Sequence, residues 1–213
     1  MIKNMRFKSD KKMDLYCYLK IRRECMVIKR GVGKVLFLAL LIKSCVFAES
    51  FVPPKSMELF GKQYALAFQN ENADVALYEY TTDNEPVENW SRLITLQYYK
   101  RKLVPLEFIT ATKAGLDNRK PIPHYSLYQK EEHGYALLIF EPSREHLNFE
   151  ADVQKSFHPV ECDGTLILQY GVRTPVFRQL SSEDKSRILK EVDGQLKLDA
   201  EQIAQNQWIP TCE

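Results

Sequence analysis

The sequence predicts an α+β fold, an antiparallel sheet with flanking helices, as a single domain over residues 49–213. Two observations support this class. Segments rich in β-branched and aromatic residues follow one another along the chain, which is typical of sequential antiparallel strands. Two segments with helix start signals lie between and after these strands. No internal repeat or low-complexity linker divides residues 49–213.

The first half of the domain is predicted to contain an irregular entry, three strands and a helix. The double proline in residues 49–57 blocks regular structure at the entry. Residues 103–116 read as a helix, because Pro105 suits a first helical turn and Gly115 marks the region of its end. The expected strands are residues 63–68, 75–81 and 93–99.

The second half is predicted to begin with a hairpin and to end with a helix. The hairpin comprises residues 124–130 and 135–142, and further strands are expected at 147–157 and 162–172. Ser181 is a helix N-cap, followed by acidic residues that favour the helix dipole. Ile188, Val192 and Leu196 give this helix an apolar face, and Gly194 is expected to interrupt it.

Residues 26–48 have the pattern of a signal peptide. A basic segment precedes the apolar run at 35–42, and Val46-Phe47-Ala48 offers a cleavage site after Ala48. The alternative is a membrane anchor, which needs about 20 apolar residues, whereas Lys43 ends this run early. A lipoprotein signal is a second alternative, because residues 41–45 end in Cys45 after a small residue, although Lys43 stands where a small or apolar residue is required. The segment predicts a periplasmic or secreted domain without a stable membrane span.

Residues 1–25 form a basic extension, which we interpret as an over-extended start with Met26 as the initiator. A basic cytoplasmic tail or nucleic-acid arm is the alternative. Residues 1–48 carry 12 Lys and Arg against 3 Asp and Glu, and the whole chain has a net charge of +2. Residues 49–213 therefore carry −7, which argues against a nucleic-acid partner.

Two cysteines remain after cleavage, Cys162 and Cys212. In an oxidising compartment an even pair predicts a disulfide, which would tie the C-terminal tail to the body. The alternative is that Cys162 is a nucleophile with His158 close by, but nothing else in the surrounding sequence supports catalysis.

No catalytic residues, metal ligands or cofactor are predicted. The four histidines form no H-x-H or H-E-x-x-H pattern. The sequence also lacks a G-x-S-x-G elbow and a phosphate-binding glycine loop. We therefore expect surface or loop roles for the histidines.

Glu88, Trp90 and Arg92 form the most distinctive local pattern, just before an apolar strand. Of two interpretations we favour a structural Trp90 that closes one end of the core, because Trp most often contributes buried area. The other is an aromatic floor for a ligand cleft flanked by Glu88 and Arg92. Together with Thr95 and the order of elements over residues 64–170, this pattern resembles exported bacterial proteins of the PsbP-like class. The resemblance implies an antiparallel sheet with helices on its faces and a role in assembly or binding, and it carries over no catalytic residues.

The sequence thus predicts an exported envelope or secreted protein that is a non-enzymatic binding or assembly factor. We expect a protein or small-ligand partner in the cell envelope. The tyrosines of the strands, residues 78, 80, 98, 99, 125 and 128, are either a sticky sheet surface or ordinary strand composition. The alternative function is a secreted hydrolase with a dispersed active site.

Overall fold

The computed structural model describes residues 51–144, 146–159, 162–206, 208 and 212. These residues lie in one compact unit that spans Val46–Glu213. The predicted extension and signal peptide, residues 1–25 and 26–48, lie outside the described residues and stay predictions. Within the described part of the chain, no helix is long and apolar enough to cross a membrane.

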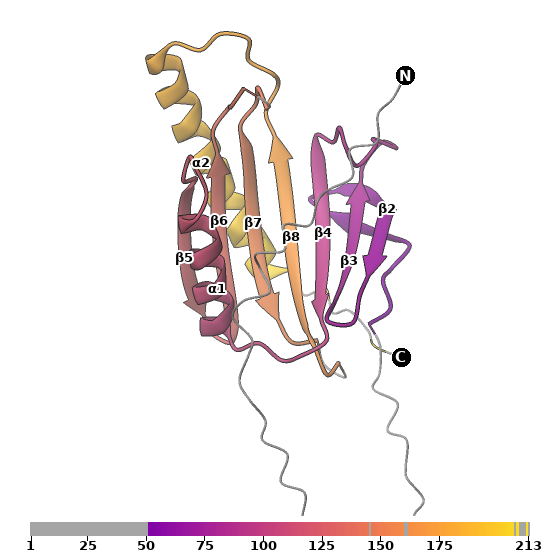
Figure 1. Ribbon diagram of the computed structural model, residues 1–213. Coiled ribbons are helices and arrows are strands. Elements are labelled where there is room, and N and C mark those ends of the chain that lie inside the picture. The colour runs from indigo at the N-terminus through magenta and orange to yellow at the C-terminus, as the bar shows by residue number, and fades with distance from the viewer. Residues whose placement is uncertain (1–50, 145, 160–161, 207, 209–211, 213) are drawn as a thin grey trace, which may run out of the picture. The chain divides into compact units, whose positions relative to one another are not determined.

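One antiparallel sheet of eight strands, ordered β1-β2-β3-β4-β8-β7-β6-β5, dominates the structure (Figure 1). The pairing of β4 with β8 joins the N-terminal half of the sheet to the C-terminal half, in register from Arg92↔Val172 to Tyr99↔Thr165. The strands are β1 Ser56–Leu59, β2 Lys62–Glu71, β3 Val75–Thr81, β4 Arg92–Tyr99, β5 His124–Lys130, β6 His133–Phe140, β7 Glu150–Phe157 and β8 Thr165–Arg173.

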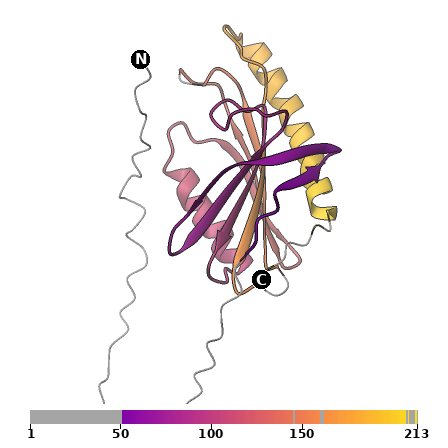
Figure 2. The same ribbon diagram turned by 90° about the vertical axis from the view of Figure 1, so that its right-hand side faces the viewer.

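The two helices, α1 (Pro105–Asp117) and α2 (Ser182–Gln205), lie on opposite faces of the sheet (Figures 1 and 2). Local signals start both helices. The Glu107 carboxylate accepts a hydrogen bond from the Val104 backbone N–H at 3.0 Å, and the Ser181 hydroxyl accepts one from the Asp184 N–H at 3.0 Å. The expected interruption at Gly194 is absent, because α2 runs through this residue without a break.

Each face of the sheet has its own apolar core. On the α2 face the core is large and aromatic, with Tyr64, Tyr80 and Phe149 fully buried. On the α1 face it is small and comprises Phe108, Leu116, Ala136, Leu138 and Ile167. Strand β6 supplies both cores, since successive side chains of a strand point to opposite faces.

The predicted α+β class is wrong, because a single curled sheet rather than a balance of strands and helices makes the fold. Figure 2 shows the N-terminal strands bending across the sheet toward α2. Met57 and Leu59 of β1 and Tyr64 of β2 enter the α2-face core. The curled end of the sheet therefore buries apolar surface together with α2. Strand patterns locate segments but do not report how strongly their sheet curls.

Cys162 and Cys212 form a disulfide, as the sequence predicts, with their Cα atoms 5.4 Å apart. Phe51 forms a β-bridge with Cys212 and stacks its ring on Tyr98 at 5.4 Å between ring centroids. The disulfide therefore fastens Cys212, which follows α2, to the β7–β8 connection at Cys162. The β-bridge joins the same residue to Phe51 at the start of the domain.

Candidate functional site

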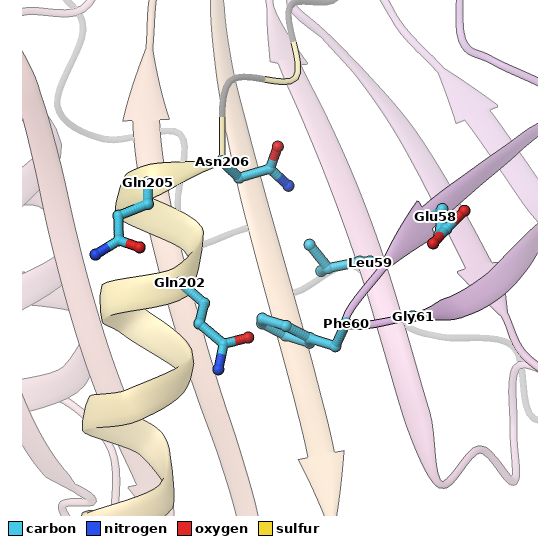
Figure 3. A pocket seen from close by; sticks show the side chains of 7 residues that line it. All are labelled: Glu58, Leu59, Phe60, Gly61, Gln202, Gln205 and Asn206. Carbon is cyan, nitrogen blue, oxygen red and sulfur yellow. The ribbon is translucent and has the colours of Figure 1, made fainter.

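A hollow of about 330 Å³ opens between the β1–β2 turn and the C-terminal end of α2 (Figure 3). Ligand sites in proteins are concave and occupy about 300–1,000 Å³, so this hollow has the size of a small-molecule site. It is lined by Glu58, Leu59, Phe60, Gly61, Gln202, Gln205 and Asn206.

The turn that forms one wall has an unusual aromatic residue. Phe60 and Gly61 have φ of 55° and 68°, and they connect the paired residues Leu59 and Lys62. A two-residue hairpin turn with two positive φ angles favours Asn-Gly, and a bulky residue at positive φ is strained. Phe60 is held there by edge-to-face packing on Tyr170, with ring centroids 4.7 Å apart.

The opposite wall is the end of α2, where Gln202, Gln205 and Asn206 line the hollow. The Gln205 side chain points away from Phe60, to the other side of the helix (Figure 3). In Figure 3 the Gln202 side chain and the Phe60 ring point toward one another across the hollow. Each amide offers an acceptor oxygen and two N–H donors. The Asn206 oxygen already accepts a hydrogen bond from the Trp208 backbone N–H at 2.8 Å.

The electrostatics of the hollow disfavour anions. Glu58 is the only ionisable residue in the lining, and its carboxylate accepts a hydrogen bond from the Gln63 side chain at 3.0 Å. The C-terminal end of a helix carries partial negative charge, and α2 turns this end toward the hollow. The geometry therefore suits a neutral, polar ligand that can donate and accept hydrogen bonds.

Trp90, one of the predicted site residues, lies elsewhere and is buried. Its side chain is 7% exposed, and the Arg173 guanidinium lies 3.8 Å from the ring centroid. A Cβ atom on Gly171 would approach the Trp90 ring to 3.0 Å and an oxygen of Asp152 to 2.8 Å. Glycine at this position is what allows the indole and the carboxyl group to lie against β8.

Asp152 is 3% exposed, and its Oδ1 atom has no hydrogen-bond partner among the described residues. Burial raises the pKa of Asp152 from 3.8 to about 8, and the charge of Glu150 adds to the rise. Arg173 and Arg119 oppose it, and Arg173 binds Glu150 at 2.9 Å. Trp90, Glu150, Asp152, Gly171 and Arg173 together form a filled cluster, which we call the Trp90–Asp152 cluster.

The other two predicted cleft residues are not brought together beside Trp90. Glu88 is exposed, and its charge is a secondary cause, after burial, of the raised pKa of Glu79 on the α1 face. Arg92 pairs with Val172 and faces α2, where it counteracts the rise in the pKa of Asp199 that burial causes. The three residues therefore do not line one cleft in this structure.

The strand tyrosines do not form a common surface. Tyr78, Tyr80 and Tyr98 are buried in the α2-face core, which agrees with ordinary strand composition. Tyr128 is exposed but stacks on Tyr135 with ring centroids 5.1 Å apart. A sticky patch built from all six tyrosines is therefore excluded.

Cys162 and His158, the alternative nucleophile and its neighbour, both have structural roles. Cys162 is in the disulfide. The His158 ring contacts the Thr165 hydroxyl at 3.2 Å, and this hydroxyl accepts a hydrogen bond from the Leu103 backbone N–H at 2.7 Å. Across the described ranges, no group of three His, Cys, Asp or Glu residues is placed to hold a metal ion.

Sequence reasoning missed every residue of the hollow. Phe-Gly flanked by strand-forming residues is a hairpin signal with an aromatic residue where Asn is favoured. The sequence therefore contained a signal for an unusual turn, namely Phe60 at a position that favours Asn. The amides of α2 carry no such signal, because nothing local shows that residues 202–206 meet the turn at 60–61.

The fold and this hollow define a single-sheet antiparallel protein with an open, amide-lined site at one end. A protein-family model matches residues 51–208, and the chain belongs to that family. The match covers nearly all of the described sheet and α2. No curated protein and no solved structure matches the chain. The resemblance to the PsbP-like class stays a prediction.

Proposed function

We propose that this chain is an exported, non-enzymatic binding protein of the cell envelope, and that the hollow between the β1–β2 turn and α2 holds its ligand. The observation that carries the proposal is the lining itself. It combines the Phe60 ring, the Gln202 amide that faces it, the Asn206 amide and the residue Glu58 in a hollow of about 330 Å³. Such groups recognise a polar molecule and fix its orientation.

The same lining argues for binding rather than for the alternative, hydrolysis. Nucleophilic catalysis needs an activated nucleophile beside a base, and glycoside hydrolysis in most families needs a pair of carboxyl groups. The lining holds Glu58 as a single carboxylate, with no Ser, Cys, His or Lys. A ligand in the hollow would therefore meet hydrogen-bonding groups but no complete catalytic set.

Export to the periplasm or to the medium is part of the proposal. The signal-like segment at 26–48 supports it, and so does the disulfide between Cys162 and Cys212, since such bonds persist in oxidising compartments.

The test is native mass spectrometry of the 49–213 protein after exposure to the small-molecule fraction of an envelope extract. We expect a bound mass at one copy per chain, which Gln202→Ala reduces. The control is Gln69→Ala, an exposed glutamine on β2 that lies eight residues from Gly61 and thus about 26 Å along the strand. Equal retention by both variants, or release of altered products with turnover, would contradict the proposal.

A further inference from the structure

We infer that the ligand of the hollow is a neutral saccharide, bound as one or two sugar rings; this inference rests on the proposed function. Sugar hydroxyls each donate and accept hydrogen bonds. Side-chain amides match them, because one amide presents a donor and an acceptor side by side. Gln202, which faces Phe60, and Asn206 supply two such groups at the end of one helix, and the Asn206 oxygen already accepts a hydrogen bond from the Trp208 N–H.

The aromatic residue of the turn supplies the second half of saccharide recognition. The C–H groups on one side of a pyranose ring form an apolar face, which packs against an aromatic side chain. Phe60 lines the hollow opposite Gln202. A strained residue persists only where its surroundings hold it, and such residues concentrate at binding sites. With a φ of 55°, Phe60 takes a position that Asn would occupy with less strain.

Charge narrows the class of saccharide. The carboxylate of Glu58 and the negative end of α2 both repel anions, and no lysine or arginine lines the hollow to compensate. Uronic acids and phosphorylated sugars would bring a negative charge into this environment. Neutral sugars would instead find Glu58 as an acceptor for hydroxyl groups.

A peptide is the competing neutral ligand, but it fits the hollow less well. Extended peptides bind by adding to a sheet edge through main-chain hydrogen bonds, and they use separate pockets for alternate side chains. The edge strand here, β1, has only four residues, and short edge strands resist such pairing. The α2 wall offers side-chain amides in place of a strand edge.

The inference is tested by isothermal titration calorimetry of the 49–213 protein with cellobiose, maltose, lactose and diacetylchitobiose. Digalacturonate is the anionic comparator, and a capped Gly-Gly amide is the peptide comparator. We expect at least one neutral disaccharide to bind at one copy per chain and more tightly than both comparators. Loss of one hydrogen-bonding side chain should weaken binding about tenfold in Gln202→Ala. Gln69→Ala should bind as the wild type does.

Phe60→Asn separates binding from structure. Asn suits the positive φ, so relief of strain should offset the lost packing on Tyr170 and leave the melting temperature nearly unchanged. Saccharide binding should nevertheless fall about tenfold. Cosedimentation with purified peptidoglycan then identifies the source: retention indicates a wall glycan, and binding of soluble disaccharides alone indicates a free sugar.

The inference is overturned if no neutral disaccharide binds at millimolar concentration, if the peptide or the uronate binds more tightly, or if Gln202→Ala leaves binding intact. These outcomes remain distinct from failure of the proposed function. If the envelope fraction still gives a bound mass that depends on Gln202, the hollow is a binding site and only the saccharide class fails. If that mass is also missing, the binding function itself fails.

Discussion

The hollow beside α2 and the Trp90–Asp152 cluster both contain polar side chains, and they differ in whether these side chains are accessible to solvent. The hollow is open, and its ionisable lining is limited to Glu58. The cluster is closed to solvent: Asp152 is 3% exposed, and Trp90 packs against Gly171. The sequence favoured a structural Trp90, with a cleft beside it as the alternative; Trp90 is buried, and the hollow described here lies at Phe60.

The difference shows what separates a structural polar cluster from a binding site. In the cluster, the Arg173 guanidinium stacks on the Trp90 indole and forms a salt bridge with Glu150. Its interactions are therefore made with groups of the protein itself. In the hollow, amides at the end of α2 face solvent and have room for a ligand. Substitutions in the cluster should therefore change stability, and substitutions in the hollow should change binding.

The largest expected effect is that of Trp90→Ala. Deleting a buried aromatic side chain of this size costs about 3–5 kcal/mol of unfolding free energy. The variant should show a clearly lower melting temperature, measured by circular dichroism. Trp90→Phe, which keeps an aromatic ring above Gly171, is the matched control and should lose less. An unchanged melting temperature in Trp90→Ala would show that the indole does not stabilise the fold.

The disulfide should contribute a similar amount by another mechanism. Closing the 50-residue separation between Cys162 and Cys212 stabilises by about 4 kcal/mol in the chain-entropy model. The double serine variant should therefore unfold at lower urea concentration than wild type. Because the bond fastens the tail after α2, this variant should also bind ligand more weakly in the hollow. Two free thiols in protein purified from the envelope, shown by alkylation and intact mass, would exclude the bond.

A pH-dependent effect is expected from Asp152. Its pKa is raised from 3.8 to about 8, chiefly by burial. Stability from the protonated form is fully present below pH 3.8 and is lost as the pH rises toward 8. Asp152→Asn removes this loss, so the variant should become more stable than wild type as the pH rises from 4 to 8. Urea unfolding at several pH values measures the difference; parallel curves would mean that Asp152 titrates normally.

The smallest stability effect is expected in the hollow. Gln202 is exposed at the end of α2, so Gln202→Ala should change the unfolding free energy by less than about 0.5 kcal/mol. Differential scanning calorimetry beside Gln69→Ala provides the comparison. A drop as large as that of Trp90→Ala would assign Gln202 to structure and remove the contrast between the two regions.

Strand positions were predictable where strand-forming residues run continuously after a turn, and the hollow was not predictable. Strand β3 was predicted at its observed bounds, Val75–Thr81, because its β-formers are continuous and a turn precedes it. Strand β1 was missed, since its four residues follow a double proline. Trp90 and Arg92 are two residues apart, and the alternative to a structural Trp90 placed both at one cleft. Strand β4 begins only at Arg92, however, so Trp90 lies in the loop and folds over the other face.

The hollow depends on contact between residues more than 140 positions apart, and local patterns contain no information about such contacts. The fold class failed for the same reason: pairing order and curl of the sheet are set by tertiary packing. The disulfide was predictable because composition and compartment constrain it without knowledge of the fold.

The most direct test of the contrast is chemical-shift mapping by nuclear magnetic resonance. ¹⁵N-labelled 49–213 protein is titrated with the disaccharide that binds best in calorimetry. We expect the shifts to concentrate on Gly61, on Asn206 and on the side-chain amide of Gln202, while the Trp90 indole N–H and the Gly171 amide stay unchanged. Shifts centred on Trp90 and Gly171, with Gly61 and Gln202 unaffected, would contradict this expectation and place the ligand at the Trp90–Asp152 cluster.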